Sequence, residues 1–116
     1  MKPFQRGQLW LVNFDPSFGH EYKKIRPALI VQHDRYIFTS TLLTIIPLSS
    51  QLAKRMVLDV VIPKGAQNRL MKDSLLKMSQ ISSFDKRRFI KYIGILNDEV
   101  LRQVDTQIKC FFFGKK

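Results

Sequence analysis

The segment from Leu9 to Val31, LWLVNFDPSFGHEYKKIRPALIV, decides how the rest of the chain is interpreted. It begins with a β-prone apolar run, Leu9 to Phe14, and ends with a second one, Ala28 to Val31. The connection between them is rich in proline and glycine, and it places a histidine, a carboxylate, two lysines and an arginine between His20 and Arg26. Rigid sheets commonly present functional groups on such connections. We therefore expect two strands joined by a loop that carries the chemistry.

Further strands are predicted by apolar, β-prone runs at 41–48, 57–62 and 90–95, and by a less regular run at 74–81. Pro47 cannot donate to a β-ladder, so it should mark an edge, a bulge or the end of a strand. Asp85 can cap a short helix that begins at Lys86, because its side chain can accept from an amide of the first turn.

A C-terminal helix from about Asp98 to Phe112 has the clearest period. Asn97 can cap it, and an apolar stripe runs along one side through Val100, Val104, Ile108 and Phe111. Short strands first and helices late predict a mostly β, α+β fold: a small, strongly curved barrel with the helix packed on the sheet. At 116 residues, we expect one domain over 1–116.

The single cysteine, Cys110, excludes an internal disulfide framework, fits a cytoplasmic location and is expected to be a core thiol. No export signal is visible, and no apolar run approaches the roughly 18 residues of a membrane span.

The charge balance is strongly basic, with 20 Lys and Arg against 9 Asp and Glu, a net charge of +11 and a pI near 10.2. Such a field favours a polyanion such as RNA or DNA, or an acidic protein. The alternative is that the lysines only keep a basic protein in solution.

Metal and nucleotide chemistry have no support in the sequence. Two histidines and one cysteine do not form a metal-binding pattern, and no P-loop or Gly-x-Gly-x-x-Gly fingerprint is present, so no metal and no cofactor are expected. RNA carries its own nucleophile, the 2′-hydroxyl, and its cleavage needs only a base, cations for the phosphate and help for the leaving oxygen. Hydrolysis of DNA usually relies on a metal.

A strand ending in Asp15-Pro16, followed by Gly19-His20-Glu21, four residues and Arg26-Pro27, resembles the MazF/PemK (Kid) family of toxin endoribonucleases. The similarity runs nearly from end to end and includes Ile46 to Ser50, Phe84 to Arg88 and Ile93-Gly94. The resemblance implies an SH3-like barrel with a C-terminal helix, a homodimer, an acidic antitoxin partner, and metal-independent, sequence-specific cleavage of single-stranded mRNA that leaves a 2′,3′-cyclic phosphate.

By matched position, the resemblance implies catalytic roles for Arg26, for Ser49 in place of the usual threonine, and for His20. Among the other matched or neighbouring residues, we expect RNA contacts at Glu21, Lys24, Ser50, Lys77, Ser79 and Gln80. Lys77 replaces an arginine of PemK-type members, Ser79 replaces a carboxylate, and Ser82 replaces an arginine of many members. Without a carboxylate at Ser79, proton abstraction falls to His20 or Glu21, and turnover is expected to be weakened.

Two alternatives stay open from the residues alone. Arg26 could form a structural ion pair with Glu21 or Asp34. The protein could also be a non-enzymatic toxin or nucleic-acid-binding module on the same barrel, resembling the gyrase poison CcdB. The loop from Gly19 to Pro27 and the hydroxyl after Pro47 favour the enzyme, because a pure binder would not need them.

Overall fold

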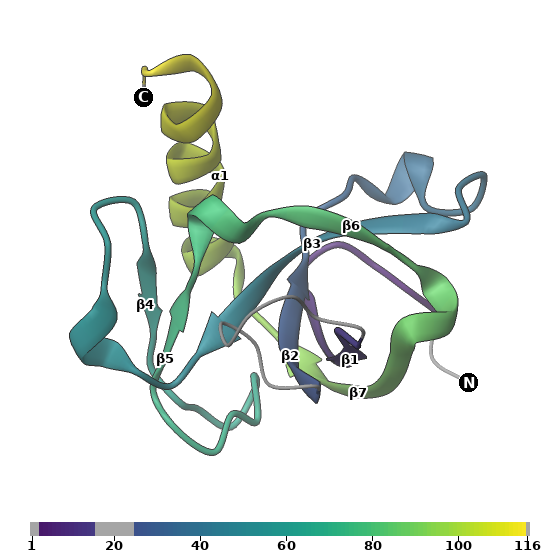
Figure 1. The fold of residues 1–116 in the computed structure, drawn as a ribbon, viewed down its shortest axis with the longest axis horizontal. Coiled ribbons are helices and arrows are strands. Elements are labelled where there is room, and N and C mark those ends of the chain that lie inside the picture. The colour runs from purple at the N-terminus through teal and green to yellow at the C-terminus, as the bar shows by residue number, and fades with distance from the viewer. Residues whose placement is uncertain (1–2, 16–24, 116) are drawn as a thin grey trace.

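The computed structural model describes residues 3–15 and 25–115 of the chain (Figure 1). In these residues the strands are β1 (Gln8–Asn13), β2 (Ile25–Ile30), β3 (Leu42–Ser49), β4 (Val60–Ile62), β5 (Ser74–Leu76), β6 (Ser82–Asp85) and β7 (Phe89–Ile95). They are followed by one α-helix, α1 (Asp98–Phe113), and interspersed with short 3-10 helices η1 (Asp34–Tyr36), η2 (Leu52–Lys54), η3 (Met78–Gln80) and η4 (Lys86–Arg88).

The strands form one antiparallel sheet in the order β4-β5-β3-β2-β1-β7, with β6 added to β3. The long strand β3 changes partner along its length: residues 42–45 pair with β6, and Leu48 and Ser49 pair with β5. Pro47 lies inside the strand between these two stretches, where its carbonyl accepts from the Lys77 amide at 3.0 Å. In place of the expected edge or bulge, β3 exchanges β6 for β5 as its neighbour at Pro47. The missing proline N–H therefore falls between the two ladders and breaks no bond of either.

Curvature of the sheet creates two apolar clusters. One lies between the sheet and α1 and is centred on the fully buried Leu9, Leu29 and Val104. The other contains Trp10, Phe14 and Phe89. The predicted fold class, mostly β with a C-terminal helix on the sheet, is confirmed. The word barrel is loose, because within the described residues β6 and β7 are not paired and the sheet does not close.

The helix α1 follows the sequence prediction closely. The Asn97 side chain accepts from the Val100 amide at 2.9 Å, and Gly114 ends the helix with a φ of 69°. Val104 is buried, whereas Phe111 is 38% exposed, so the expected apolar stripe ends before its last member. Cys110 is only half-buried and is not the core thiol that we expected. The last turns of α1 extend beyond the sheet (Figure 1).

Several strand boundaries differ from the predictions. β2 begins at Ile25 instead of Ala28, so Arg26 and Pro27 belong to a strand that pairs with β1. β4 begins at Val60 instead of Val57, because a turn with the Asp59 amide bonded to the Met56 carbonyl precedes it. The run at 74–81 divides into β5 and η3, and the strand β6 was not predicted. The expected cap at Asp85 is confirmed, since its side chain accepts from the Arg87 amide at 2.8 Å.

Gly7 links the segment before β1 to β2 and to the residue that follows β7. Its amide donates to the Ile30 carbonyl at 2.8 Å, and its carbonyl accepts from the Leu96 amide at 3.0 Å. Its φ of 91° favours glycine, and a Cβ there would lie 2.8 Å from a methyl carbon of Leu101. The segment before β1 is therefore fixed against the junction between β7 and α1.

Among the described residues, no helix has both the length and the apolar character needed to cross a membrane.

Candidate functional site

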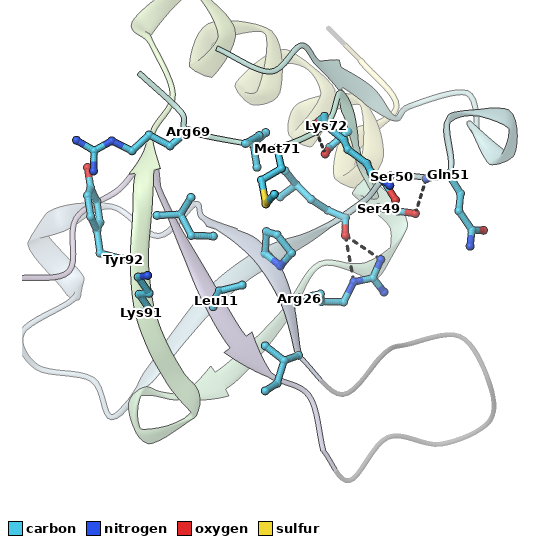
Figure 2. A pocket seen from close by; sticks show the side chains of 16 residues that line it. Leu11, Arg26, Ser49, Ser50, Gln51, Arg69, Met71, Lys72, Lys91 and Tyr92 are labelled. Atoms are coloured by element: carbon cyan, nitrogen blue, oxygen red, sulfur yellow. Dashed lines mark hydrogen bonds between the residues drawn. The ribbon is translucent and has the colours of Figure 1, made fainter. Parts of the chain in front are cut away.

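An open cleft of about 760 Å³ crosses the sheet (Figure 2). Part of its lining comes from one row of residues across three strands, because Leu11 of β1 pairs with both Pro27 of β2 and Lys91 of β7. The end of β3 and the segment 69–72, between β4 and β5, also line it. The cleft therefore combines an apolar surface with polar and basic groups.

Arg26 is half-buried at the wall of this cleft. Its Nε and Nη2 donate to the Leu48 carbonyl at 3.0 and 2.8 Å, so the guanidinium holds a fixed plane against the end of β3 (Figure 2). Ser49 follows Leu48 directly. The hydrogen bonds therefore fix the Arg26 side chain against the end of β3, and Arg26 and Ser49 line the same cleft.

Ser49 and Ser50 both line the cleft, with Ser49 half-buried and Ser50 exposed. The Ser49 Oγ accepts from the Gln51 amide at 3.2 Å. A hydroxyl that accepts this bond still has its own proton to donate to a ligand oxygen. Of the nine predicted site residues, the structure brings together Arg26, Ser49 and Ser50.

His20, Glu21 and Lys24 lie outside the described residues. Their expected roles stay predictions, as does the alternative pairing of Arg26 with Glu21. The other alternative partner, Asp34, accepts a hydrogen bond from the Arg6 amide at 2.6 Å.

Lys77 was predicted to bind RNA, but the structure gives it another role. Its side chain is buried and its Nζ donates to the Asp59 carboxylate at 2.5 Å and to the Lys54 carbonyl at 3.1 Å. Asp59 is 2% exposed and also accepts from the amides of Met56 and Met78. A buried ammonium with these partners holds the segment after Ser49 in place. We therefore remove Lys77 from the RNA contacts.

Ser79 and Gln80 are not brought into the cleft either, since both belong to η3 and neither is among the residues that line it. Ser79 is exposed, whereas the buried Gln80 Oε1 has no hydrogen-bond partner among the described residues. Ser82 donates to the Gln80 carbonyl at 3.2 Å. The predicted contacts of Ser79 and Gln80 with RNA are thus not supported by their positions.

Several cleft residues were missed by the sequence analysis: Gln51, Arg69, Met71, Lys72, Lys91 and Tyr92. The charges of Arg69, Lys72 and Lys91 were visible in the sequence, but no periodic pattern connects the segment 69–72 with β7. Only the fold of the chain between β4 and β5 brings them together.

Metal ligation has no site in the described part of the chain, where no group of three His, Cys, Asp or Glu residues is placed to hold an ion. The cleft offers instead a guanidinium, hydroxyls and ammonium groups. These can neutralise and orient an anion such as a phosphate.

Comparison with known proteins gives the chain a family. Residues 5–112 match the family described as PemK-like, MazF-like toxin of type II toxin-antitoxin system. The chain is 31% identical over 110 residues to endoribonuclease MazF9 of Mycobacterium tuberculosis, covering 90% of this chain and 92% of that protein.

Solved structures agree in fold. MazF from Deinococcus radiodurans, in crystal form I, superposes with a TM-score of 0.75 at 26% identity and covers 92% of this chain and 94% of its own. The MazE-MazF complex from the same organism, in form II, gives a TM-score of 0.72 at 22% identity over 97% of this chain and 96% of that chain. The chain with Arg26 and Ser49 in its cleft therefore belongs to the PemK-like, MazF-like family of type II toxin-antitoxin toxins.

Proposed function

We propose that this protein is a toxin endoribonuclease that cuts single-stranded mRNA without metal or cofactor, by attack of the 2′-hydroxyl on the adjacent phosphate. The observation that carries the proposal is the Arg26 guanidinium, fixed on the Leu48 carbonyl in an open cleft that Ser49 also lines. The family and the 31% identical relative, an endoribonuclease, support it.

The two fixed groups have distinct roles in this reaction. Negative charge grows on the phosphoryl oxygens as the 2′-oxygen attacks, and preorganised donors there lower the barrier. Arg26 stays protonated and therefore serves as the cationic clamp. The Ser49 hydroxyl, oriented by the Gln51 amide, donates to a second phosphoryl oxygen.

The general base is assigned to His20, with Glu21 as the alternative. An unperturbed histidine has a pKa of about 6.5, which suits proton transfer at neutral pH. Ser79 cannot accept that proton as a carboxylate would. If His20 is the base, the cleavage rate rises between about pH 6 and 7, and His20→Ala abolishes the rise. An unchanged profile in the variant would move the assignment to Glu21.

The deciding experiment is incubation of the purified protein with a long RNA in EDTA, followed by mapping of the ends. Fragments that end in a 2′,3′-cyclic phosphate are expected. A perfect duplex of the same sequence should be spared, because a stiff helix cannot present splayed bases to the cleft. Intact RNA at high protein concentration would instead favour the non-enzymatic, CcdB-like alternative.

The proposal includes an acidic antitoxin as partner. The net charge of +11 attracts an acidic peptide as well as RNA, and the structurally similar Deinococcus toxin was crystallised with MazE. We propose that a disordered acidic segment folds over the cleft and excludes RNA, and that the toxin acts as a homodimer in the cytoplasm.

Expression of the toxin alone and with its neighbouring reading frame tests these partners. Growth should stop in the first case and recover in the second, with the two proteins copurifying. A harmless protein that purifies as a monomer and never with the neighbour would contradict this part.

A further inference from the structure

The end of the cleft opposite Arg26 has no role in the proposed chemistry. It is lined by Arg69 and Met71, which lie between β4 and β5, and by Lys91 and Tyr92 of β7, whereas Lys72 lies nearer Ser50 (Figure 2). Figure 2 shows Arg69 and Tyr92 at this end and Arg26 and Ser49 at the other, with Met71 between them. A volume of about 760 Å³ lies within the range of roughly 300–1,000 Å³ that is typical of ligand sites.

The backbone holds Arg69 in an unfavourable conformation. Its φ of 56° is the only positive value at a non-glycine residue in the described part of the chain. The Arg69 amide donates to the Gly65 carbonyl at 2.9 Å. The Asn68 carboxamide accepts from the amides of Gly65 and Leu70, both at 3.0 Å, and donates to the Pro63 carbonyl. Such a conformation persists only where the surroundings over-determine it, often at a functional site.

This segment also rests directly on β7. The Ile95 amide donates to the Gln67 carbonyl at 3.2 Å. A Cβ at Gly94 would lie only 2.4 Å from the Asn68 carbonyl oxygen, so the two backbones touch where β7 has no side chain. Arg69 therefore projects from a segment that is fixed to the strand carrying Tyr92.

The side chains at this end match the surfaces and donors that bind a nucleobase. The Tyr92 ring packs edge-on against Trp10 of the core, with centroids 6.0 Å apart, and so is held in one orientation. Met71 is 91% exposed, and its thioether is turned into the cleft in Figure 2. A flat base can lie against an aromatic ring and a polarizable sulfur. The Arg69 guanidinium offers two parallel N–H donors for its edge.

We propose that this end is a base-recognition subsite, in which Tyr92 stacks on a guanine of the bound single strand and Arg69 donates to its O6 and N7. The assignment rests on the proposed ribonuclease function. Guanine fits because O6 and N7 are adjacent acceptors on one edge, the usual bidentate partner of arginine. The larger purine ring also covers more of Tyr92. Lys72 and Lys91 provide charge for the neighbouring phosphates.

Arg69→Gly is the informative substitution, because glycine adopts a positive φ at no steric cost while the side chain is removed. The urea midpoint should therefore not fall. Cleavage of a mixed-sequence single-stranded RNA should lose its guanine preference at one position, with the preferred sites cut roughly 10- to 100-fold more slowly and the poor sites little changed. Arg69→Lys should show the same loss of guanine preference, because lysine keeps the positive charge but lacks the two parallel N–H donors of the guanidinium. Lys109→Met, an exposed position on α1, is the matched control.

A binding assay separates this subsite from the catalytic proposal. The probes are 2′-deoxy oligonucleotides, which cannot be cut, carrying either guanine or 7-deazaguanine, which lacks the N7 acceptor. The wild type should bind the guanine probe more tightly, and Arg69→Gly should bind both equally. An uncut RNA together with this binding difference would overturn the ribonuclease and retain the subsite. Equal binding of both probes by the wild type would overturn the subsite. So would a cleavage assay in which Arg69→Gly loses activity equally at all sequences while Arg69→Lys behaves like the wild type.

Discussion

Substitution of Lys77 by methionine tests the structural role that the buried ion pair gives this residue. Methionine keeps much of the length and apolar volume of the side chain and removes its charge. The Asp59 carboxylate, 2% exposed, then keeps only the amides of Met56 and Met78 at 2.9 and 3.1 Å, and the Lys54 carbonyl loses its donor.

The expected loss of stability follows from these contacts. Removal of one partner from a buried pair costs about 3–5 kcal/mol, because the other charge stays uncompensated. The two remaining amide donors place Lys77→Met near the lower end of that range. A domain of this size loses roughly 4 °C in Tm per kcal/mol, so the Tm should fall by about 12 °C.

Urea unfolding at pH 7 measures this loss, with Lys109→Met on the exposed side of α1 as the control. Lys77→Met/Asp59→Asn also removes the buried negative charge and should recover part of the stability. The affinity of the double variant for single-stranded RNA should stay within about threefold of the wild-type value. This change is small compared with the salt-dependent loss of affinity that follows when one phosphate contact is removed. A Lys77→Met protein that keeps the wild-type midpoint and m-value but binds RNA much more weakly would refute the reasoning and restore Lys77 as an RNA contact.

Three further predictions concern the site and its support. Arg26→Ala should slow RNA cleavage by about a hundredfold or more, with a much smaller effect on RNA affinity, and equal losses in both assays would make Arg26 only a docking charge. Gly94→Ala should lower the free energy of unfolding by about 1–3 kcal/mol and slow cleavage, because the new methyl meets the Asn68 backbone. Gly65→Ala is the control, since the nearest neighbouring atom to a Cβ there is at 3.8 Å. Equal urea midpoints of the two variants would contradict the clash. The side-chain hydrogen bond from Arg87 lowers the pKa of Asp85 from 3.8 to about 2. The stabilisation by the Asp85 carboxylate is therefore present above pH 3.8 and is lost as the pH falls through about 2, so the urea midpoints at pH 5 and pH 2 should differ less in Asp85→Asn than in the wild type. An equal difference in both proteins would show that this carboxylate does not contribute.

Features that depend on short stretches of sequence could be predicted. The Asn97 cap and the helix after it follow from side chains within one turn of each other. The meeting of Arg26 and Ser49 was predicted through the family motif, and pairing of β2 with β3 explains how residues 23 positions apart come together. β6 was missed because Ser82-Ser83 is polar and its strand conformation comes from pairing with β3.

The errors at the site have the same physical origin. Nothing near Lys77 in the sequence indicates burial, since its partner Asp59 lies 18 residues earlier and is brought to it by the fold. The far end of the cleft depends on contact between Asn68 and Gly94, where the decisive feature is a missing side chain.

The position of β1 between β2 and β7 has a consequence for synthesis of the protein. The row formed by Leu11, Pro27 and Lys91 cannot assemble on a ribosome until residues about 80 positions after β1 have emerged from it. Pairing of such distant segments is also slow to form. A nascent chain therefore has no complete cleft until β7 has emerged from the ribosome, so synthesis of the central strand alone does not yet produce the site.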